Sequence, residues 1–186
     1  MPRLWTDTLD EHRQAVRDAT LDATAALVTE RGLYGVTMSE IATRTGIGRA
    51  TLYKYFPDVQ SILIAWHERA IAMHLRQLTA LARADGQPLQ RLTAVLEAYA
   101  TIEHAHGDHP LAPLVHGGAH HARGRNALVQ LLAELIAQCA ANGDVRADIP
   151  ADELAGYSVH ALGAAAELPA SSVATVVALT LAALRR

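Results

Sequence analysis

The stretch from Gly32 to Pro57 constrains the fold of this chain more than any other part of the sequence. Glycines and the closing proline divide it into two short segments that each have helical character. Thr37 and Glu40 have the spacing of a capping box, so a helix is expected to begin there and to end at Gly46. A second helix is expected over residues 49–56. Two short helices joined by a tight turn that contains glycine predict a helix-turn-helix motif.

The composition favours an all-α fold. Alanine and leucine, both good helix formers, account for one residue in three, whereas aromatic residues make up only 4%. The apolar content of 51% argues against disorder. Because Cys139 is the only cysteine, a disulfide scaffold is excluded and a reducing compartment is indicated. We expect a cytoplasmic protein without a membrane span, since no long uncharged apolar run and no apolar signal core are present.

Further helices are expected on both sides of the motif. Apolar residues recur at steps of three and four, and glycine, proline and asparagine separate the periodic segments. The expected helices cover residues 9–31, 58–84, 89–104, 122–141, 151–167 and 172–184, with a loop at 106–118. Side-chain caps are expected from Asp58 or Ser61, from Asp152, and from Ser171 or Ser172.

Positive charge gathers in the same stretch as the two short helices. Residues 31–57 carry a net charge of +3 inside a chain whose formal total is −3. Leu52 and Phe56 lie four residues apart and can share a buried face, which leaves two tyrosines, a threonine and two cations facing outward. Such side chains suit contacts with DNA phosphates and with base edges in a major groove. The pattern predicts a local DNA-binding surface on an acidic protein.

The segment from Gly32 to Pro57, which reads GLYGVTMSEIATRTGIGRATLYKYFP, resembles the DNA-binding signature of TetR-type transcriptional regulators. The similarity extends over roughly the first third of the chain. It implies a helix-turn-helix DNA-binding domain at 1–57 and a helical bundle for ligand binding and dimerisation at 58–186. It also implies a homodimeric repressor that binds a pseudopalindromic DNA operator, with no catalytic residues and no cofactor.

The resemblance assigns the DNA contacts to particular positions. These are Thr37, Arg44, Gly48, Arg49, Ala50, Thr51, Tyr53, Lys54 and Tyr55. Gly48 stands where the family often has a serine cap, and Val59 stands where it often has a lysine. Both differences imply weaker nonspecific DNA binding and a shallower salt dependence.

The second half of the chain is expected to supply the dimer interface and a ligand cavity. The last two helices are implied to pair with their copies in a partner subunit through Leu154, Tyr157, Ser158, Ala161, Leu162, Val173, Val176, Val177 and Thr180. The expected pocket residues are Trp66, His67, Ala70, Met73, His74, Leu96, Tyr99, Leu114, His116, Leu128 and Leu132. We expect a small hydrophobic or aromatic effector that releases the DNA, with the long helix at 58–84 carrying the coupling.

The histidines leave an alternative open. Six of the ten lie close together, namely His104, His106, His109, His116, His120 and His121. They are either solvated or pocket-lining side chains, or the ligands of a metal in a helical metalloenzyme. No cysteine or HExxH pattern accompanies them, so the sequence predicts no metal site. A small-molecule carrier or sensor that has lost DNA binding is a further alternative.

Overall fold

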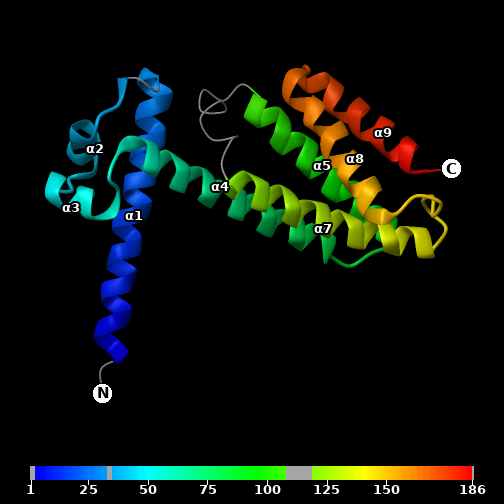
Figure 1. Cartoon of the computed structure of the whole chain (residues 1–186), viewed down its shortest axis with the longest axis horizontal. Coiled ribbons are helices and arrows are strands. Elements are labelled where there is room, and N and C mark those ends of the chain that lie inside the picture. The colour runs from blue at the N-terminus through cyan, green and yellow to red at the C-terminus, as the bar shows by residue number, and fades with distance from the viewer. Residues whose placement is uncertain (1–2, 33–34, 108–118, 186) are drawn as a thin grey trace. The chain divides into compact units, whose positions relative to one another are not determined.

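The computed structural model describes residues 3–32, 35–107 and 119–185 (Figure 1). Every regular element in these ranges is helical, so the predicted all-α fold is confirmed. The chain divides into two compact units, Met1–Ala70 and Ile71–Arg186. The division falls inside the long helix α4 (Val59–Ala82), which therefore contributes to both units.

The first unit contains α1 (Arg3–Arg31), α2 (Met38–Thr45), α3 (Arg49–Tyr55) and the first turns of α4. Helix α1 begins six residues before its predicted start at Leu9, and it ends at Arg31 as expected. Gly32 ends α1 in a left-handed conformation with φ 76°, and its N–H donates to the Val28 carbonyl at 2.8 Å.

Leucines and isoleucines from all four helices form the core of the first unit. Leu21, Ile41, Leu52 and Ile62 are each at most 1% exposed. In α1 the buried face also includes Thr20 and Thr24, although threonine carries a hydroxyl. The Thr24 hydroxyl donates to the Thr20 carbonyl at 2.8 Å, so its polar group is satisfied within the helix.

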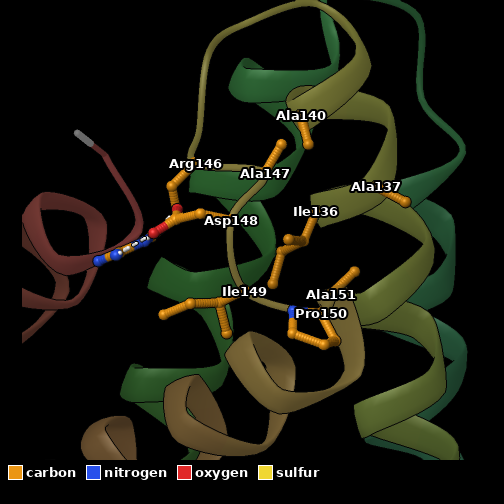
Figure 2. Close-up of a pocket in the computed structure, with 9 residues that line it drawn as sticks. All are labelled: Ile136, Ala137, Ala140, Arg146, Ala147, Asp148, Ile149, Pro150 and Ala151. Carbon is orange, nitrogen blue, oxygen red and sulfur yellow. Dashed lines mark hydrogen bonds and ion pairs between the residues drawn. The ribbon is translucent and has the colours of Figure 1, made fainter.

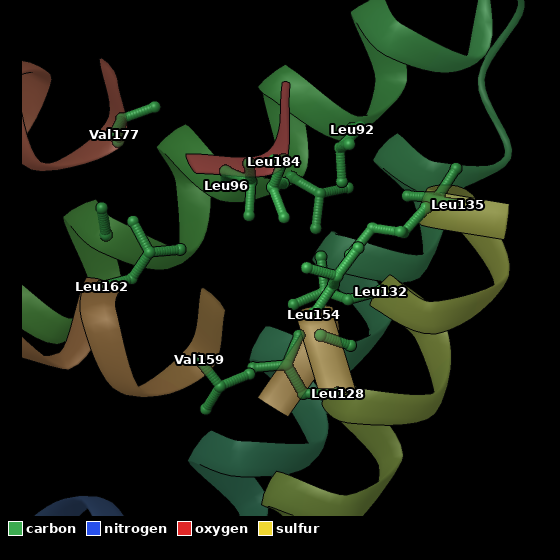
Figure 3. Packing of buried hydrophobic residues seen from close by; sticks show 14 of the residues in the cluster. Leu92, Leu96, Leu128, Leu132, Leu135, Leu154, Val159, Leu162, Val177 and Leu184 are labelled. Carbon is green, nitrogen blue, oxygen red and sulfur yellow. The ribbon is translucent and has the colours of Figure 1, made fainter. Parts of the chain in front are cut away.

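The second unit contains the end of α4 together with α5 (Pro88–Gly107), α7 (Ala119–Ala141), α8 (Ala151–Gly163) and α9 (Val173–Leu184). Helices α5, α7, α8 and α9 pack on one another. Figure 3 shows leucines and valines from these four helices meeting in one continuous core.

The predicted ends of the last helices need correction. The helix expected to reach residue 167 changes at Gly163 into a 3-10 turn, η2 (Ala164–Glu167). The following 3-10 turn η3 (Ala170–Ser172) precedes α9. Pro150 and Ser172 occupy the N-cap positions of α8 and α9 without a side-chain cap bond, so the caps expected from Asp152, Ser171 and Ser172 are wrong.

The cap predicted for α4 is present. The Ser61 N–H donates to the Asp58 carboxylate at 2.7 Å, and the Asp58 N–H donates to the Ser61 hydroxyl at 3.4 Å. This reciprocal pair satisfies backbone donors that the start of a helix leaves without partners. Helix α4 therefore begins at a fixed place immediately after the helix-turn-helix.

Candidate nucleic-acid interface and ligand-binding unit

Local hydrogen bonds set the boundaries of α2. The Glu40 N–H donates to the Thr37 hydroxyl at 3.3 Å, and the Thr37 N–H donates to the Glu40 carboxylate at 2.9 Å, which completes the predicted capping box. Gly46 ends the helix with φ 69°, a left-handed conformation that glycine adopts at little cost. The helix-turn-helix is thus defined by interactions between neighbouring residues.

Two buried side chains fix the orientation of α3. Leu52 is fully buried and Phe56, directly after the helix, is 3% exposed. Gly48 occupies the N-cap position in extended conformation and has no side-chain cap, as the sequence predicts. Arg17 of α1 places its guanidinium 5.1 Å from the centre of the Phe56 ring, within range of a cation–π contact. One face of α3 is therefore anchored and the rest of the helix faces solvent.

The residues predicted to contact DNA lie largely on this solvent-facing side of α3. Six exposed members of the predicted set lie in α3 or at its N-cap, namely Gly48, Arg49, Ala50, Thr51, Tyr53 and Lys54. Thr37 and Arg44 are exposed as well. Tyr53 is 47% exposed, whereas Tyr55 is half-buried. Hydroxyl, aromatic and cationic groups thus share one surface, which we call the recognition surface.

Ion pairs remove part of the positive charge that the sequence count assigns to this region. Arg44 binds the Glu30 carboxylate with both terminal nitrogens, at 2.7 and 3.2 Å. Arg31 binds the Glu40 carboxylate at 2.6 Å. Within the described residues, Arg49 and Lys54 form no ion pair. The available positive charge of the recognition surface therefore resides on these two side chains.

The carboxylates in these pairs have altered acidity. Hydrogen bonds from Thr37, followed by the charge of Arg31, lower the pKa of Glu40. The hydrogen bond from Arg44 lowers the pKa of Glu30. Thr37 also donates its hydroxyl proton to Glu40 at 2.9 Å. Its hydroxyl is thus engaged in the capping box as both donor and acceptor. Thr37 therefore acts as a helix cap, and its hydroxyl can donate to a phosphate only by giving up its bond to the Glu40 carboxylate.

Charged residues also connect α1 to the beginning of α4 inside the first unit. The Arg69 guanidinium donates to the Asp18 carboxylate at 2.9 Å and also binds Asp22, one turn further along α1. Hydrogen bonds from Gln14 and Arg69 lower the pKa of Asp18. Arg69 was not predicted as a site residue. Its contact with two acids four residues apart arises only from the packing of α4 on α1.

The residues predicted to line a ligand pocket are distributed over different environments. In the first unit His67 is 6% exposed, with Trp66 and Ala70 half-buried. In the second unit Leu96, Leu128 and Leu132 lie in the core, and Met73 is 51% exposed. Leu114 and His116 lie outside the described residues. The predicted set is therefore mixed, with core, surface and partly buried members.

Two of the predicted pocket residues do combine partial burial with polar chemistry. Tyr99 is half-buried in α5, and burial together with the neighbouring Glu103 carboxylate raises its pKa. His74 of α4 is half-buried, and burial lowers its pKa. Its ring lies 5.2 Å from the ring of His106, measured between centroids. Glu103 and His106 were not predicted as pocket residues.

A surface hollow of about 420 Å³ lies at a different place in the second unit (Figure 2). Its walls come from the end of α7, the connection to α8 and the first residue of α8, and they are mainly alanine, isoleucine and proline. Arg146 and Asp148 at its edge form a two-bond ion pair, at 2.9 and 2.7 Å. The predicted pocket residues do not contribute to this hollow.

Most of the residues predicted for a dimer interface are buried inside their own subunit. Leu154, Ser158, Leu162, Val176, Val177 and Thr180 are each at most 9% exposed. Their side chains are therefore core residues, and the hydroxyls of Ser158 and Thr180 bond to carbonyls one turn earlier. Of the predicted set, Tyr157 is 49% exposed and Ala161 and Val173 are half-buried. The sequence pattern identified the apolar helices but not which face of each is outward.

Within the described residues, no group of three or more histidine, cysteine, aspartate or glutamate side chains is arranged to hold a metal ion. Three of the six clustered histidines, at positions 109, 116 and 120, lie where the structure describes no side chain. His104 contacts the Ala165 carbonyl through Nδ1 at 3.2 Å. Cys139 is fully buried in the core of the second unit, as its apolar helix predicts.

The fold and the recognition surface together define a helix-turn-helix protein with a second, helical unit. Residues 21–65 match the family described as bacterial regulatory proteins, tetR family. These residues therefore form a DNA-binding region of the TetR type. The TetR family consists of regulators rather than enzymes.

Curated relatives match about half of the molecule. The nucleoid occlusion factor SlmA of Haemophilus influenzae is 29% identical over 96 residues, which cover 52% of this chain and 43% of SlmA. A helix-turn-helix transcriptional regulator of Mycobacterium bovis, itself uncharacterised, is 32% identical over 96 residues, which cover 52% of this chain and 48% of that protein. The chain thus matches less than half the length of these relatives.

Solved structures share the fold over nearly the whole chain. A TetR/AcrR-family regulator from Thermobifida fusca superposes with a TM-score of 0.79 at 20% identity, covering 91% of this chain and 98% of the other. FadR of Bacillus subtilis, solved with stearoyl-CoA, superposes with a TM-score of 0.64 at 16% identity, covering 89% of this chain and 94% of FadR. Within the part of the chain that the structure describes, none of the helices is both long and apolar enough to cross a bilayer.

Proposed function

We propose that this chain is a transcriptional repressor that binds a pseudopalindromic DNA operator through the recognition surface of α3. The proposal rests on Arg49 and Lys54, which form no ion pair within the described residues, and on the exposed hydroxyl and aromatic groups that lie between them in α3. Arginine and lysine neutralise phosphates and hydrogen-bond to guanine, whereas threonine and tyrosine contact phosphates and thymine methyl groups. The anchored Leu52 holds this surface in a fixed orientation.

In the proposed complex, Arg49 and Lys54 make different contributions. Arg49 opens the helix and is positioned for the bases or their flanking phosphates, whereas Lys54 lies in its last turn and serves as a phosphate contact. Arg44 takes part only by exchanging its bond to Glu30 for a phosphate. The proposed domain boundary after Pro57 separates this DNA-binding region from the rest of α4.

Selection from a pool of random DNA duplexes tests this proposal. The recovered sequences should share a two-fold symmetric consensus with half-sites about one helical turn, or roughly 10 base pairs, apart.

Arg49→Ala should weaken binding to the consensus by about 1–3 kcal/mol. Lys54→Ala should weaken binding to all duplexes and reduce the salt slope by about one unit. The matched control is Arg83→Ala, an exposed arginine of the second unit. Equal affinity of Arg49→Ala and the unmodified protein would refute the role of α3.

We also propose that the chain acts as a homodimer through the outward face of α8 and α9. Tyr157 is 49% and Leu179 is 66% exposed, and the other exposed residues of α9 are alanines and one threonine. A helix that presents no charge on its outer face favours burial against another apolar surface. A symmetric pair also supplies the two recognition helices that a palindromic site requires.

Sedimentation velocity tests the dimer. Leu179→Glu places a charge in the middle of the proposed interface and should shift the protein from dimer to monomer. The control is Ala127→Glu on the exposed side of α7, which should leave the sedimentation coefficient unchanged. A dimer that persists in Leu179→Glu at the same concentration would place the interface elsewhere.

The effector is proposed to bind in the second unit and to favour a conformation that does not fit DNA. Tyr99 offers a half-buried hydroxyl, next to the Glu103 carboxylate, for a polar contact with the effector. Stearoyl-CoA is the first compound to test, because the structurally similar FadR of Bacillus subtilis was solved with it. A complete release of DNA requires about 5.5 kcal/mol of differential affinity for the two conformations.

Fluorescence anisotropy of the labelled consensus duplex measures this release. Stearoyl-CoA should lower the anisotropy in a saturable manner, and Tyr99→Phe should raise the concentration needed. Free coenzyme A is the control. If neither stearoyl-CoA nor shorter acyl-CoA compounds change the anisotropy, this class of effector is excluded.

A cytoplasmic location follows from the proposed DNA partner.

A further inference from the structure

Two histidines that the DNA-binding role does not use face each other in the second unit. His74 lies in α4 and His106 lies in the last turn of α5. Their ring centroids are 5.2 Å apart and the ring planes are tilted by 53°. Both side chains are half-buried. Two helices far apart in the sequence thus bring two imidazoles together at a partly desolvated position.

The separation of the rings fits two imidazoles that share one metal ion. Zinc binds imidazole nitrogen at about 2.0–2.1 Å, and the ring centre lies about 1.1 Å behind that nitrogen. Two such ligands at a tetrahedral angle place their ring centroids about 5 Å apart, close to the observed separation. A simple aromatic contact also tolerates centroids 4.5–7 Å apart, so the experiment below must distinguish the two arrangements.

The surroundings hold His106 in place. A Cβ atom added at the next residue, Gly107, would lie 1.8 Å from the Ala166 carbonyl oxygen, so the end of α5 packs directly on the backbone of η2. In the same turn His104 contacts the Ala165 carbonyl at 3.2 Å. A ligand on a fixed helix end binds a metal with little loss of conformational freedom.

We propose that His74 and His106 form a two-histidine site for a transition-metal ion of the zinc type. Imidazole ligands suit Zn²⁺, Cu²⁺ and Ni²⁺ rather than Mg²⁺ or Ca²⁺. Within the described residues, His74 and His106 are not part of a larger cluster of potential metal ligands. A site with two protein ligands leaves the remaining coordination positions to exchangeable groups such as water. The site is therefore an exchangeable one rather than a closed structural zinc site.

Calorimetric titration of the metal-free full chain with Zn²⁺ tests the proposal. One equivalent per subunit should bind. His74→Gln and His106→Gln should each weaken binding about tenfold or more, and the double variant should lose little beyond either single variant, because the site needs both rings. The matched control is His160→Gln, an exposed histidine of α8, which should bind zinc as the unmodified protein does.

Two further measurements keep the result unambiguous. Co²⁺ in place of Zn²⁺ should give the intense visible absorption of a tetrahedral site, and this band should be absent from both single variants. Each variant is also unfolded thermally without metal, and zinc should raise the melting temperature of the unmodified protein but not of either variant. Unchanged zinc affinity in His74→Gln and His106→Gln, or no stoichiometric binding to the unmodified protein, would show that the two rings make an aromatic contact only.

Discussion

Gly107→Ala provides a direct test of the packing that holds the second unit together. The added Cβ would lie 1.8 Å from the oxygen, 2.6 Å from the carbonyl carbon and 2.9 Å from the Cα of Ala166. These are backbone atoms, so the contact cannot be relieved by rotating a side chain. Either the end of α5 or the 3-10 turn η2 has to move, and the bond between His104 and the Ala165 carbonyl is strained when it does.

The expected cost follows from three contributions. Overpacking in a close contact costs about 1–3 kcal/mol. Loss of the hydrogen bond from His104 adds about 1 kcal/mol. Against these, alanine is better than glycine in a helix by up to about 1 kcal/mol. The net destabilisation is about 1–3 kcal/mol, so a value near 2 kcal/mol would lower the melting temperature by about 4–8 °C.

Urea unfolding followed by circular dichroism measures this change at one protein concentration and without added metal. The control is Ala105→Gly, an exposed residue of the same turn, which isolates the helix-propensity contribution. That variant should lose up to about 1 kcal/mol. If Gly107→Ala is as stable as the unmodified protein or more stable, helix propensity alone determines its free energy of unfolding. The proposed close contact between α5 and η2 is then refuted.

Four further outcomes are expected. Thr37→Ala should lower the free energy of unfolding by about 1 kcal/mol in urea titrations, because it removes the α2 cap. Leu52→Ala should cost about 2–5 kcal/mol and abolish DNA binding with it, since a fully buried side chain anchors α3. Burial and the Asp144 carboxylate raise the pKa of Cys139 to about 11, so Ellman's reagent should label this thiol only after unfolding. Because Glu40 has a lowered pKa when folded, its stabilising contribution is present above the pKa of the unfolded state and is lost on acidification; acid titration of Glu40→Gln should therefore show a shallower loss of stability below about pH 5.

The DNA-binding end of the molecule was predictable in detail because its signals are local. The capping box, the left-handed glycine at 46 and the buried pair Leu52 and Phe56 all involve residues within a few positions of one another. Charge was less predictable. A count of residues gave a net +3, whereas the fold pairs Arg44 with Glu30, fourteen positions away in the sequence.

Apolar periodicity was less informative about which face of a helix is buried. In α1 the apolar residues Val16, Ala19, Ala23, Ala26 and Leu27 recur at helical spacing. Of these Ala19 is exposed, whereas Thr20, Leu21 and Thr24 are buried. A threonine whose hydroxyl bonds to the preceding turn behaves as a small core residue, which a hydrophobicity pattern does not reveal. In α9 every position is an apolar residue or a threonine, so hydrophobicity alone does not distinguish the inward from the outward side.

The sequence by itself determined the all-α fold, the helix-turn-helix and the residues that α3 exposes, because short-range capping and helix periodicity decide them. The tertiary structure alone decided which cations remain free, which faces of α8 and α9 stay uncovered, and that His74 and His106 meet. These properties depend on contacts between segments that are distant along the chain, and a pattern of neighbouring residues contains no record of them.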